Sequence, residues 1–244
     1  MFIHYRTQGI VLKKVDRKEA DQLFSIYTKD FGRLEILGKA IRKISSKLRA
    51  GIDLFYLSEI EFIQGKAHKT LTDAILIEKF KNLSRDLEKS TIALEISEVL
   101  DALIHGQEPD ERIWNLLVET FRDLDKLDTK KRNPKIIYHY FFWNFLSLLG
   151  YAPELYKCVL CQGELEPQKL YFSPQHGGVV CEKCFLKENS AKEVSSDVIK
   201  ILRVVLKKEK NYIYRLKLKE KHFQELDKLS KYYFEFISEQ VGEI

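Results

Sequence analysis

Four cysteines are the residues of this chain best suited to bind a metal. There are no others, and they form two C-x2-C pairs separated by nineteen residues: Cys158, Cys161, Cys181 and Cys184. Each pair can place two thiolates on one ion, and two pairs complete the tetrahedral shell that Zn²⁺ prefers. We therefore predict one structural zinc ion in a zinc ribbon at about residues 155–186. Four thiolates leave no open position for a reacting water, so we expect no catalytic role for the metal.

Two disulfides are the alternative use of the same cysteines. Disulfides are typical of exported proteins, and charged residues within the first fourteen positions interrupt any apolar stretch that could act as a signal peptide. We therefore expect a cytoplasmic protein with a metal site. His176 lies between the pairs and could replace a ligand, but Gly177 and Gly178 follow it, which favours a turn at this point.

No other pattern in the sequence indicates catalysis or a nucleotide site. The G-x4-G-K-[ST] loop is missing, as are the G-x-S-x-G and H-E-x-x-H motifs. The six histidines are scattered along the chain. The sequence therefore predicts a protein that is not an enzyme, uses no nucleotide cofactor and works by binding. A fold can still bring distant carboxylates together, so a zinc-independent nuclease is a remaining alternative.

The net positive charge lies in the first third of the chain. Residues 1–80 hold fifteen Lys or Arg and ten Asp or Glu, whereas residues 81–244 hold twenty-six of each. The segment Gly38–Gly51 contains five cations and no acid, and its apolar residues are spaced as in a short helical turn. The positive side chains of this segment repel one another unless an anion binds between them. We therefore predict phosphate contacts by Lys39, Arg42, Lys43, Lys47 and Arg49. A solvated connector is the alternative. Arg33 and Lys13, on strands expected to be adjacent, are second-rank candidates for phosphate contacts.

Hydrophobic periodicity divides the chain into a β-rich and a helical part. Stretches rich in β-prone residues and separated by turns predict five strands, at about residues 5–14, 21–28, 33–38, 54–64 and 70–80, and the third and fourth show a clear period of two. Closure into an OB-type barrel would remove their exposed edges. Beyond residue 80 the period becomes 3.6, which predicts helices that begin near Ser84, Pro109, Pro134, Ser195 or Ser196, and Lys219. We expect an α+β protein with an OB-fold DNA-binding domain at 1–80 and a helical bundle at 81–244 that carries the inserted ribbon.

One apolar stretch has to be compared with a membrane span. Residues 136–153 carry no formal charge but include His139, Asn144 and Ser147. The stretch is shorter than the ~20 residues that a spanning helix needs. We therefore predict a buried helix at the centre of the bundle and no membrane contact.

The order of these features resembles the RecO family of bacterial recombination-mediator and DNA-repair proteins. The N-terminal motifs T-x-G-I-V-L, E-x-D-x-L, T-K-D-x-G and G-K-x-x-R occur in the family's order, and CVLCQG and GGVVCEKC resemble its zinc module. The resemblance implies a protein that binds single- and double-stranded DNA, anneals complementary strands, and is nucleoid-associated when bound to DNA. It also implies that the protein, with the partner RecR, helps to load RecA on DNA coated with single-strand-binding protein.

The resemblance further implies that the acidic, apolar C-terminal tail of single-strand-binding protein binds the helical bundle. A cluster of cations before the aromatic helix is our candidate site, with a solvated loop as the alternative: Arg122, Lys126, Lys130, Lys131, Arg132 and Lys135. The alternative function is a zinc-ribbon, OB-fold RNA-binding or transcription-accessory protein, because both modules occur in that class as well.

Overall fold

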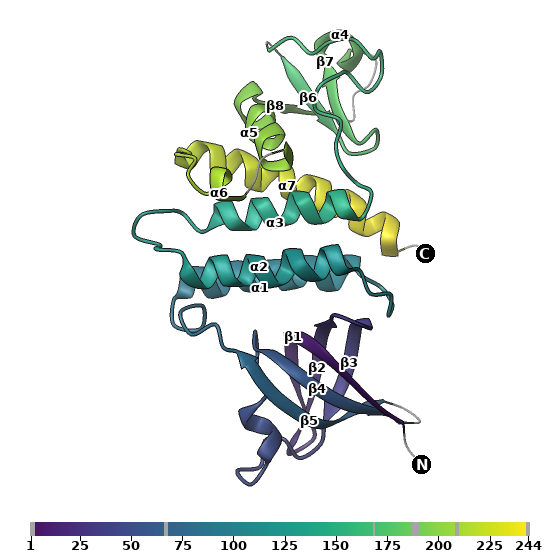
Figure 1. Ribbon diagram of the computed structural model, residues 1–244. Helices are drawn as coiled ribbons and strands as arrows, with labels where there is room; N and C mark the ends of the chain where they lie inside the picture. The colour runs from purple at the N-terminus through teal and green to yellow at the C-terminus, as the bar shows by residue number, and fades with distance from the viewer. Residues whose placement is uncertain (1–2, 66–67, 168, 187–190, 208–209, 243–244) are drawn as a thin grey trace. The chain divides into compact units, whose positions relative to one another are not determined.

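The chain forms two compact units, Met1–Arg132 and Asn133–Ile244 (Figure 1). The computed structural model describes residues 3–65, 68–167, 169–186, 191–207 and 210–242. The first unit contains a β-barrel and two helices. The second contains the ribbon and the remaining helices. The first two helices therefore share a compact unit with the barrel.

A closed five-stranded barrel makes up most of the first unit. Its strands are β1 (His4–Arg17), β2 (Asp21–Thr28), β3 (Gly32–Gly38), β4 (Leu57–Gln64) and β5 (Lys69–Glu78). They pair in the order β1–β2–β3–β5–β4, and β4 pairs back with β1. Only the short contact between β3 and β5 is parallel among these pairs. Inward-facing apolar side chains of alternate residues fill the barrel, which confirms the predicted OB-type barrel.

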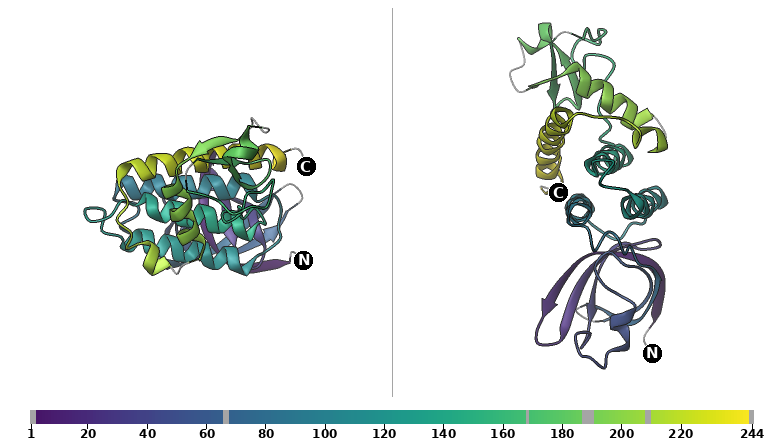
Figure 2. Two further views of the ribbon diagram at one scale, coloured as in Figure 1. Left: turned by 90° about the horizontal axis from the view of Figure 1, so that it is seen from above. Right: turned by 90° about the vertical axis from the view of Figure 1, so that its left-hand side faces the viewer.

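Helices α1 (Leu87–Leu103) and α2 (Glu111–Lys126) lie side by side near one end of the barrel (Figure 2). Each begins after an aspartate whose carboxylate accepts hydrogen bonds from two backbone N–H groups of the first turn: Asp86 for α1 and Asp110 for α2. A carboxylate also suits the positive end of the helix dipole. The first helix, expected to begin near Ser84, begins at Leu87, because Asp86 takes the capping position.

An aromatic core holds the helices of the second unit together. They are α3 (Lys135–Leu148), α5 (Ser196–Lys207), α6 (Lys210–Ile213) and α7 (Glu220–Gly242), and α3 packs against the other three. The indole of Trp143 on α3 stacks on Tyr233 of α7 with ring centroids 5.7 Å apart. Trp143 is fully buried together with Phe141, Phe142 and Phe145 of the same helix, as predicted for this stretch. Among the described residues, none of the helices combines the length and the apolar character needed to cross a membrane.

A polar network joins α3 to α7 inside this core. The buried ring of His139 places Nδ1 3.3 Å from Oγ of Ser230. Its Nε2 lies 3.0 Å from Oδ1 of Asp227 but is not aligned for a hydrogen bond. Burial lowers the pKa of His139, although Asp227 acts in the opposite direction. The imidazole is therefore a neutral core group and not a metal ligand.

The ribbon is built on a three-stranded antiparallel sheet. Strands β6 (Leu170–Ser173), β7 (Gly178–Cys181) and β8 (Lys192–Val194) pair in the order β7–β6–β8, and a short helix, α4 (Glu182–Phe185), follows β7. His176 and Gly177 lie in the turn between β6 and β7. Gly177 has a φ of +64°, which a glycine adopts without strain. The predicted hairpin is confirmed.

Candidate metal centre and nucleic-acid interface

The four cysteines come together in the ribbon. Cys158 and Cys161 lie in the turn that precedes β6, Cys181 ends β7, and Cys184 lies in α4. All four are free cysteines, and their Sγ atoms lie within 4.8 Å of one another. His176 is not part of this group in the described structure. The cysteines are thus positioned to hold one metal ion, as their spacing predicts.

The spacing of the sulfur atoms fits a tetrahedral ion. Zn–S bonds of about 2.3 Å separate the sulfur atoms of a tetrahedron by about 3.8 Å. The Sγ atoms of Cys161 and Cys181 lie 3.9 Å apart, whereas a disulfide needs about 2.05 Å. The backbone N–H of Cys181 also donates to Sγ of Cys158 at 3.4 Å, an interaction that stabilises a thiolate ligand.

The surroundings favour a thiolate at one cysteine and disfavour it at another. Burial acts to raise the pKa of Cys158, but hydrogen bonds from the backbone N–H groups of Cys161, Cys181 and Leu160 lower it to about 6. Burial and hydrogen bonds to the other three thiols raise the pKa of Cys184 to about 12. Four thiolates this close repel one another, so a bound cation is needed to deprotonate them all.

Few buried side chains pack around the four cysteines, although Phe172 on the opposite face of the sheet is buried against Trp143 and Tyr233. Among the described residues, the buried cluster at the cysteines consists of Cys158, Val180 and Ala191. Partly buried groups pack around it, including the rings of Tyr171 and Phe185, which stack with centroids 3.7 Å apart. So small a cluster contributes little to ordering the two cysteine turns, and metal binding is expected to supply much of the free energy that orders them.

The basic segment between β3 and β4 is anchored to the barrel by two of its apolar residues, whereas a third, Ile44, is exposed. Ile41 is buried and Leu48 packs against the barrel core. The predicted helical turn is present as η1, a 3₁₀ helix at Lys47–Ala50. Next to it, a Cβ on Gly51 would lie 1.8 Å from the carbonyl oxygen of Ala74, so the segment approaches β5 closely. These contacts hold the loop in place while its charged residues remain outside.

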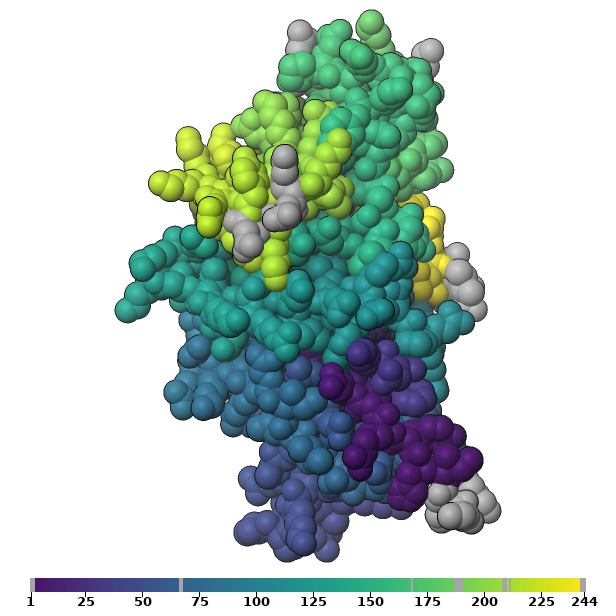
Figure 3. Space-filling model, in the orientation of Figure 1, coloured from purple at the N-terminus to yellow at the C-terminus, as the bar shows by residue number. Residues whose placement is uncertain are grey.

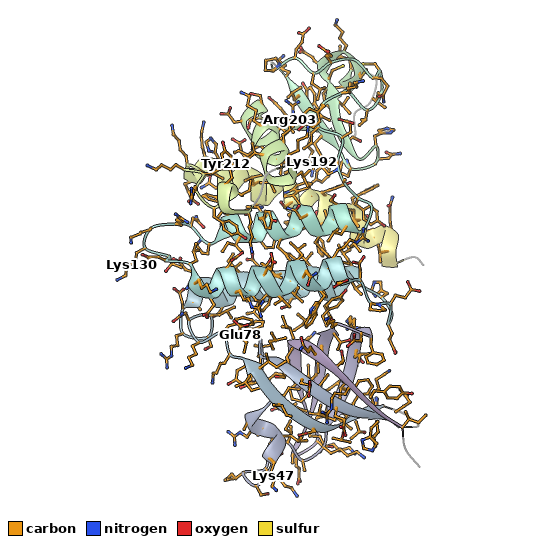
Figure 4. The ribbon with its side chains drawn as sticks, viewed as in Figure 1. Lys47, Glu78, Lys130, Lys192, Arg203 and Tyr212 are labelled. Atoms are coloured by element: carbon orange, nitrogen blue, oxygen red, sulfur yellow. The ribbon has the colours of Figure 1, made fainter. Side chains whose placement is uncertain are left out.

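All five predicted phosphate-binding cations of this loop are exposed: Lys39, Arg42, Lys43, Lys47 and Arg49. Figure 4 shows Lys47 at the end of the barrel remote from α1 and α2. The guanidinium of Arg42 lies 3.1 Å from a carboxylate oxygen of Asp16, so the expectation that no acid neighbours these cations is wrong for Arg42. No ion pair joins the other four to an acid within the described ranges. An exposed pair is worth less than about 1 kcal/mol, so Arg42 can exchange Asp16 for a phosphate.

The two second-rank cations occupy different environments. Lys13 lies on β1 and Arg33 on β3, and β2 separates these strands, so the expected adjacency is wrong. Lys13 is exposed. The side chain of Arg33 is only 22% exposed and donates to the carboxylate of Asp101 on α1. Burial acts to raise the pKa of Asp101, but hydrogen bonds from Arg33 and Ser25 hold it below its usual value. Arg33 therefore ties the barrel to α1 and is poorly placed to bind DNA.

The six cations predicted to bind a partner's tail differ in their contacts. Arg122 lies 2.8 Å from a carboxylate oxygen of Glu78, and Lys131 lies 3.3 Å from that of an aspartate three residues earlier. Lys135 lies 2.6 Å from a carboxylate oxygen of Asp227 and belongs to the second unit, whereas the other five belong to the first. The remaining three are exposed: Lys126, Lys130 and Arg132. Three of the six thus already have an acidic partner in their own unit.

The analysis of the sequence missed two exposed aromatic side chains of the second unit. Tyr156 is 42% exposed and Tyr212 is 54% exposed, and no other aromatic residue is among the exposed large hydrophobic groups of the described chain. Both lie within or beside the basic segment 200–221. The run KNYIYRLKLKEK shows this combination of rings and cations, but the charge averaged over residues 81–244 conceals it.

Comparisons with known proteins agree on one family. Residues 1–80 match the family model described as "Recombination protein O N terminal", and residues 84–240 match "Recombination protein O C terminal". The chain is 30% identical to the DNA repair protein RecO of Dehalococcoides mccartyi over 236 residues, which cover 97% of this chain and 91% of that protein. It is also 30% identical to the DNA repair protein RecO of Acetivibrio thermocellus, over 94% of this chain and 90% of the relative.

Proposed function

The chain belongs to the RecO family of recombination proteins, and we propose that it acts in DNA repair as a non-enzymatic recombination mediator. The observation that carries this proposal is the match of both family models, which together span residues 1–80 and 84–240. The relatives named DNA repair protein RecO are similar over nearly their whole length, which supports the same role for this chain.

DNA binding is proposed to occur through the barrel and its basic loop. The loop holds five exposed cations, four of which have no acidic partner in the described structure. Such a surface neutralises phosphates and releases their counterions, and phosphate contacts carry no sequence information. The protein should therefore bind single- and double-stranded DNA with little sequence preference.

Strand annealing follows from the same surface without any energy source. Two complementary strands repel each other through their phosphates, and cations that neutralise both lower that repulsion. Base pairing then supplies the driving force. We further propose, from family membership, that the protein acts with RecR to help load RecA on DNA coated with single-strand-binding protein.

The metal is proposed to be one structural zinc ion. The sulfur spacing of 3.9 Å between Cys161 and Cys181 fits Zn²⁺, and four cysteines are its usual ligands in such ribbons. Four protein ligands leave no site for substrate, so the zinc would stabilise the ribbon and take no part in a reaction.

The tail of single-strand-binding protein has two candidate sites. One is the cation cluster predicted from the sequence, where Lys126, Lys130 and Arg132 are exposed. The other is a cavity of 450 Å³ between β8 and α7, lined by Lys192, Glu193, Val194, Ser195, Glu225, Lys228, Leu229 and Tyr232. Its apolar and aromatic walls suit the apolar part of the tail, but the carboxylates of Glu193 and Glu225 offset the charge of its two lysines. Charge reversal at Lys131 and Arg132, compared with reversal at Lys192 and Lys228, distinguishes the sites by the affinity for the tail peptide.

The decisive test of the proposed function is a titration of labelled, unstructured DNA at several salt concentrations, followed by an annealing assay. We expect salt-dependent binding, faster annealing of complementary strands, and no cleavage with Mg²⁺ or Mn²⁺. A clear preference for RNA of the same sequence would favour an RNA-binding function instead. Cleavage of the DNA would show that the protein is a nuclease.

A further inference from the structure

The helical part of the chain is neutral only on average. Residues 200–221 contain nine Lys or Arg and two Glu, a net charge of +7. The rest of residues 81–244 contains seventeen Lys or Arg and twenty-four Asp or Glu, a net charge of −7. The positive charge of this short segment exceeds the net charge of +5 of residues 1–80, where the predicted DNA contact lies.

The connection from α6 to α7 turns its cations toward solvent. Arg215, Lys217 and Lys219 are exposed, and the half-buried Leu216 and Leu218 alternate with them. Within the described ranges, no ion pair joins Arg215, Lys217 or Lys219 to an acid. The leucines hold the connection against its unit while the three cations form a row on the outside.

Helix stability does not explain these cations. The connection leads directly into α7, which begins at Glu220. The first turn of α7 carries a positive partial charge, which disfavours the neighbouring cation of Lys219 by up to about 1 kcal/mol, whereas Arg215 and Lys217 lie before that turn. Lys207, at the C-terminal end of α5, is by contrast favourably placed. None of the three cations stabilises α7, and their exposed row is suited to an anionic partner.

Exposed rings accompany the cations. The ring of Tyr156 lies 4.1 Å from Nζ of Lys207 and 4.7 Å from Cζ of Arg203. Arg203 Nε also donates to the carbonyl oxygen of Leu155 at 2.9 Å, which fixes the backbone next to this tyrosine. Tyr212 lies on α6, which packs against α5 (Figure 4). The segments α5 and α6 form part of the surface of the second unit in Figure 3.

We propose that this surface is a second contact site for single-stranded DNA, separate from the barrel loop. We define it as the α6 surface, made of Tyr156, Lys207, Tyr212, Arg215, Lys217 and Lys219. Cations that follow phosphates, combined with exposed rings on which bases stack, are the features that bind single strands without sequence preference. An acidic protein segment would neutralise the cations but would leave the exposed ring of Tyr212 without a role, whereas Tyr156 already contacts Lys207 and Arg203. The inference rests on the proposed DNA-binding function and extends it, because each unit would then hold its own stretch of DNA.

The test compares matched variants of the full-length, metal-bound protein on a fluorescent oligothymidylate by anisotropy. The triple variant Arg215→Ala, Lys217→Ala, Lys219→Ala should shallow the log–log salt dependence by roughly two units, at roughly 0.7 per phosphate contact. The control removes three exposed lysines elsewhere on the second unit, Lys169, Lys183 and Lys231, and therefore the same charge. The control should bind like the unchanged protein, and all variants should melt at the same temperature because the altered side chains are exposed.

A second variant separates stacking from charge. Tyr212→Leu should weaken binding roughly tenfold, the effect of losing one stacked base. It should leave the salt dependence unchanged because it removes no cation. In addition, an oligonucleotide carrying 5-bromodeoxyuridine should cross-link on irradiation to the peptide that contains Tyr156 or Tyr212.

The outcomes distinguish this inference from the function on which it rests. If the unchanged protein binds no DNA, both are overturned. If a barrel-loop variant loses binding while the Arg215, Lys217 and Lys219 variant behaves like the control, only the α6 surface is overturned. If polyglutamate displaces the oligonucleotide and Tyr212→Leu has no effect, the surface serves an acidic protein and the inference is wrong.

Discussion

Removing three cations from the barrel loop should weaken DNA binding by an amount that the structure allows us to state. The variant is Arg42→Ala, Lys43→Ala, Lys47→Ala. All three side chains are exposed, and only Arg42 has an acidic neighbour, Asp16, at 3.1 Å. If each cation contacts one phosphate, the log–log salt slope on a single strand shallows by roughly 2 units. Plots of log affinity against log salt concentration for the variant and the unchanged protein should meet at about 1 M salt, where phosphate contacts contribute little. The affinity of the variant at about 0.1 M salt should therefore be about 100-fold lower.

The assay is a salt titration of anisotropy on an unstructured oligonucleotide, with circular dichroism melting to confirm the fold. A matched control removes three exposed cations of the same unit outside the loop: Lys29, Lys81 and Arg85. It should change affinity and slope much less. Equal slopes for the loop variant and the control would show that the loop is a solvated connector. A slope shallowed by roughly 1.4 units would mean that Arg42 keeps its pairing with Asp16 and that only the two lysines bind phosphate.

Three further predictions concern stability. Cys158→Ser, or chelation of the metal, should release about one zinc per chain and lower the melting temperature. If free zinc is kept at 100 times its Kd, loss of the metal lowers the free energy of unfolding by about 2.7 kcal/mol. Unchanged melting after metal loss would contradict a structural role. Asp101→Asn should cost about 2 kcal/mol at neutral pH because Asp101 accepts from Ser25 and Arg33. Since the folded pKa of Asp101 is lowered, this stabilisation is present above the unfolded pKa of about 3.9 and disappears as the pH falls below it, so wild type and variant should converge in acid denaturant titrations. Gly51→Ala should lower the free energy of unfolding, measured in urea, by about 3 kcal/mol, because its Cβ would lie 1.8 Å from the carbonyl oxygen of Ala74. An unchanged free energy of unfolding would show that the loop shifts freely.

Local patterns predicted the barrel and the metal ligands because both depend on short-range spacing. Alternation of apolar residues places the five strands at nearly the observed positions, since a strand with one buried face needs a period of two. The two C-x2-C pairs identify all four clustered cysteines because each knuckle is a single local turn. Pro134 likewise marks the beginning of α3, where a missing N–H costs nothing.

Tertiary structure alone decided which cations remain available. Arg33 and Lys43 look alike in the sequence, yet Arg33 is paired with Asp101, sixty-eight residues away, and Lys43 is exposed. Asp16 similarly approaches Arg42 through pairing of strands and loops that no local pattern encodes. The α6 surface depends in the same way on Tyr156, which reaches Lys207 only after the ribbon folds back on α5. The physical reason is that a charge interacts through space within a few ångströms, and folding determines which distant residues come that close.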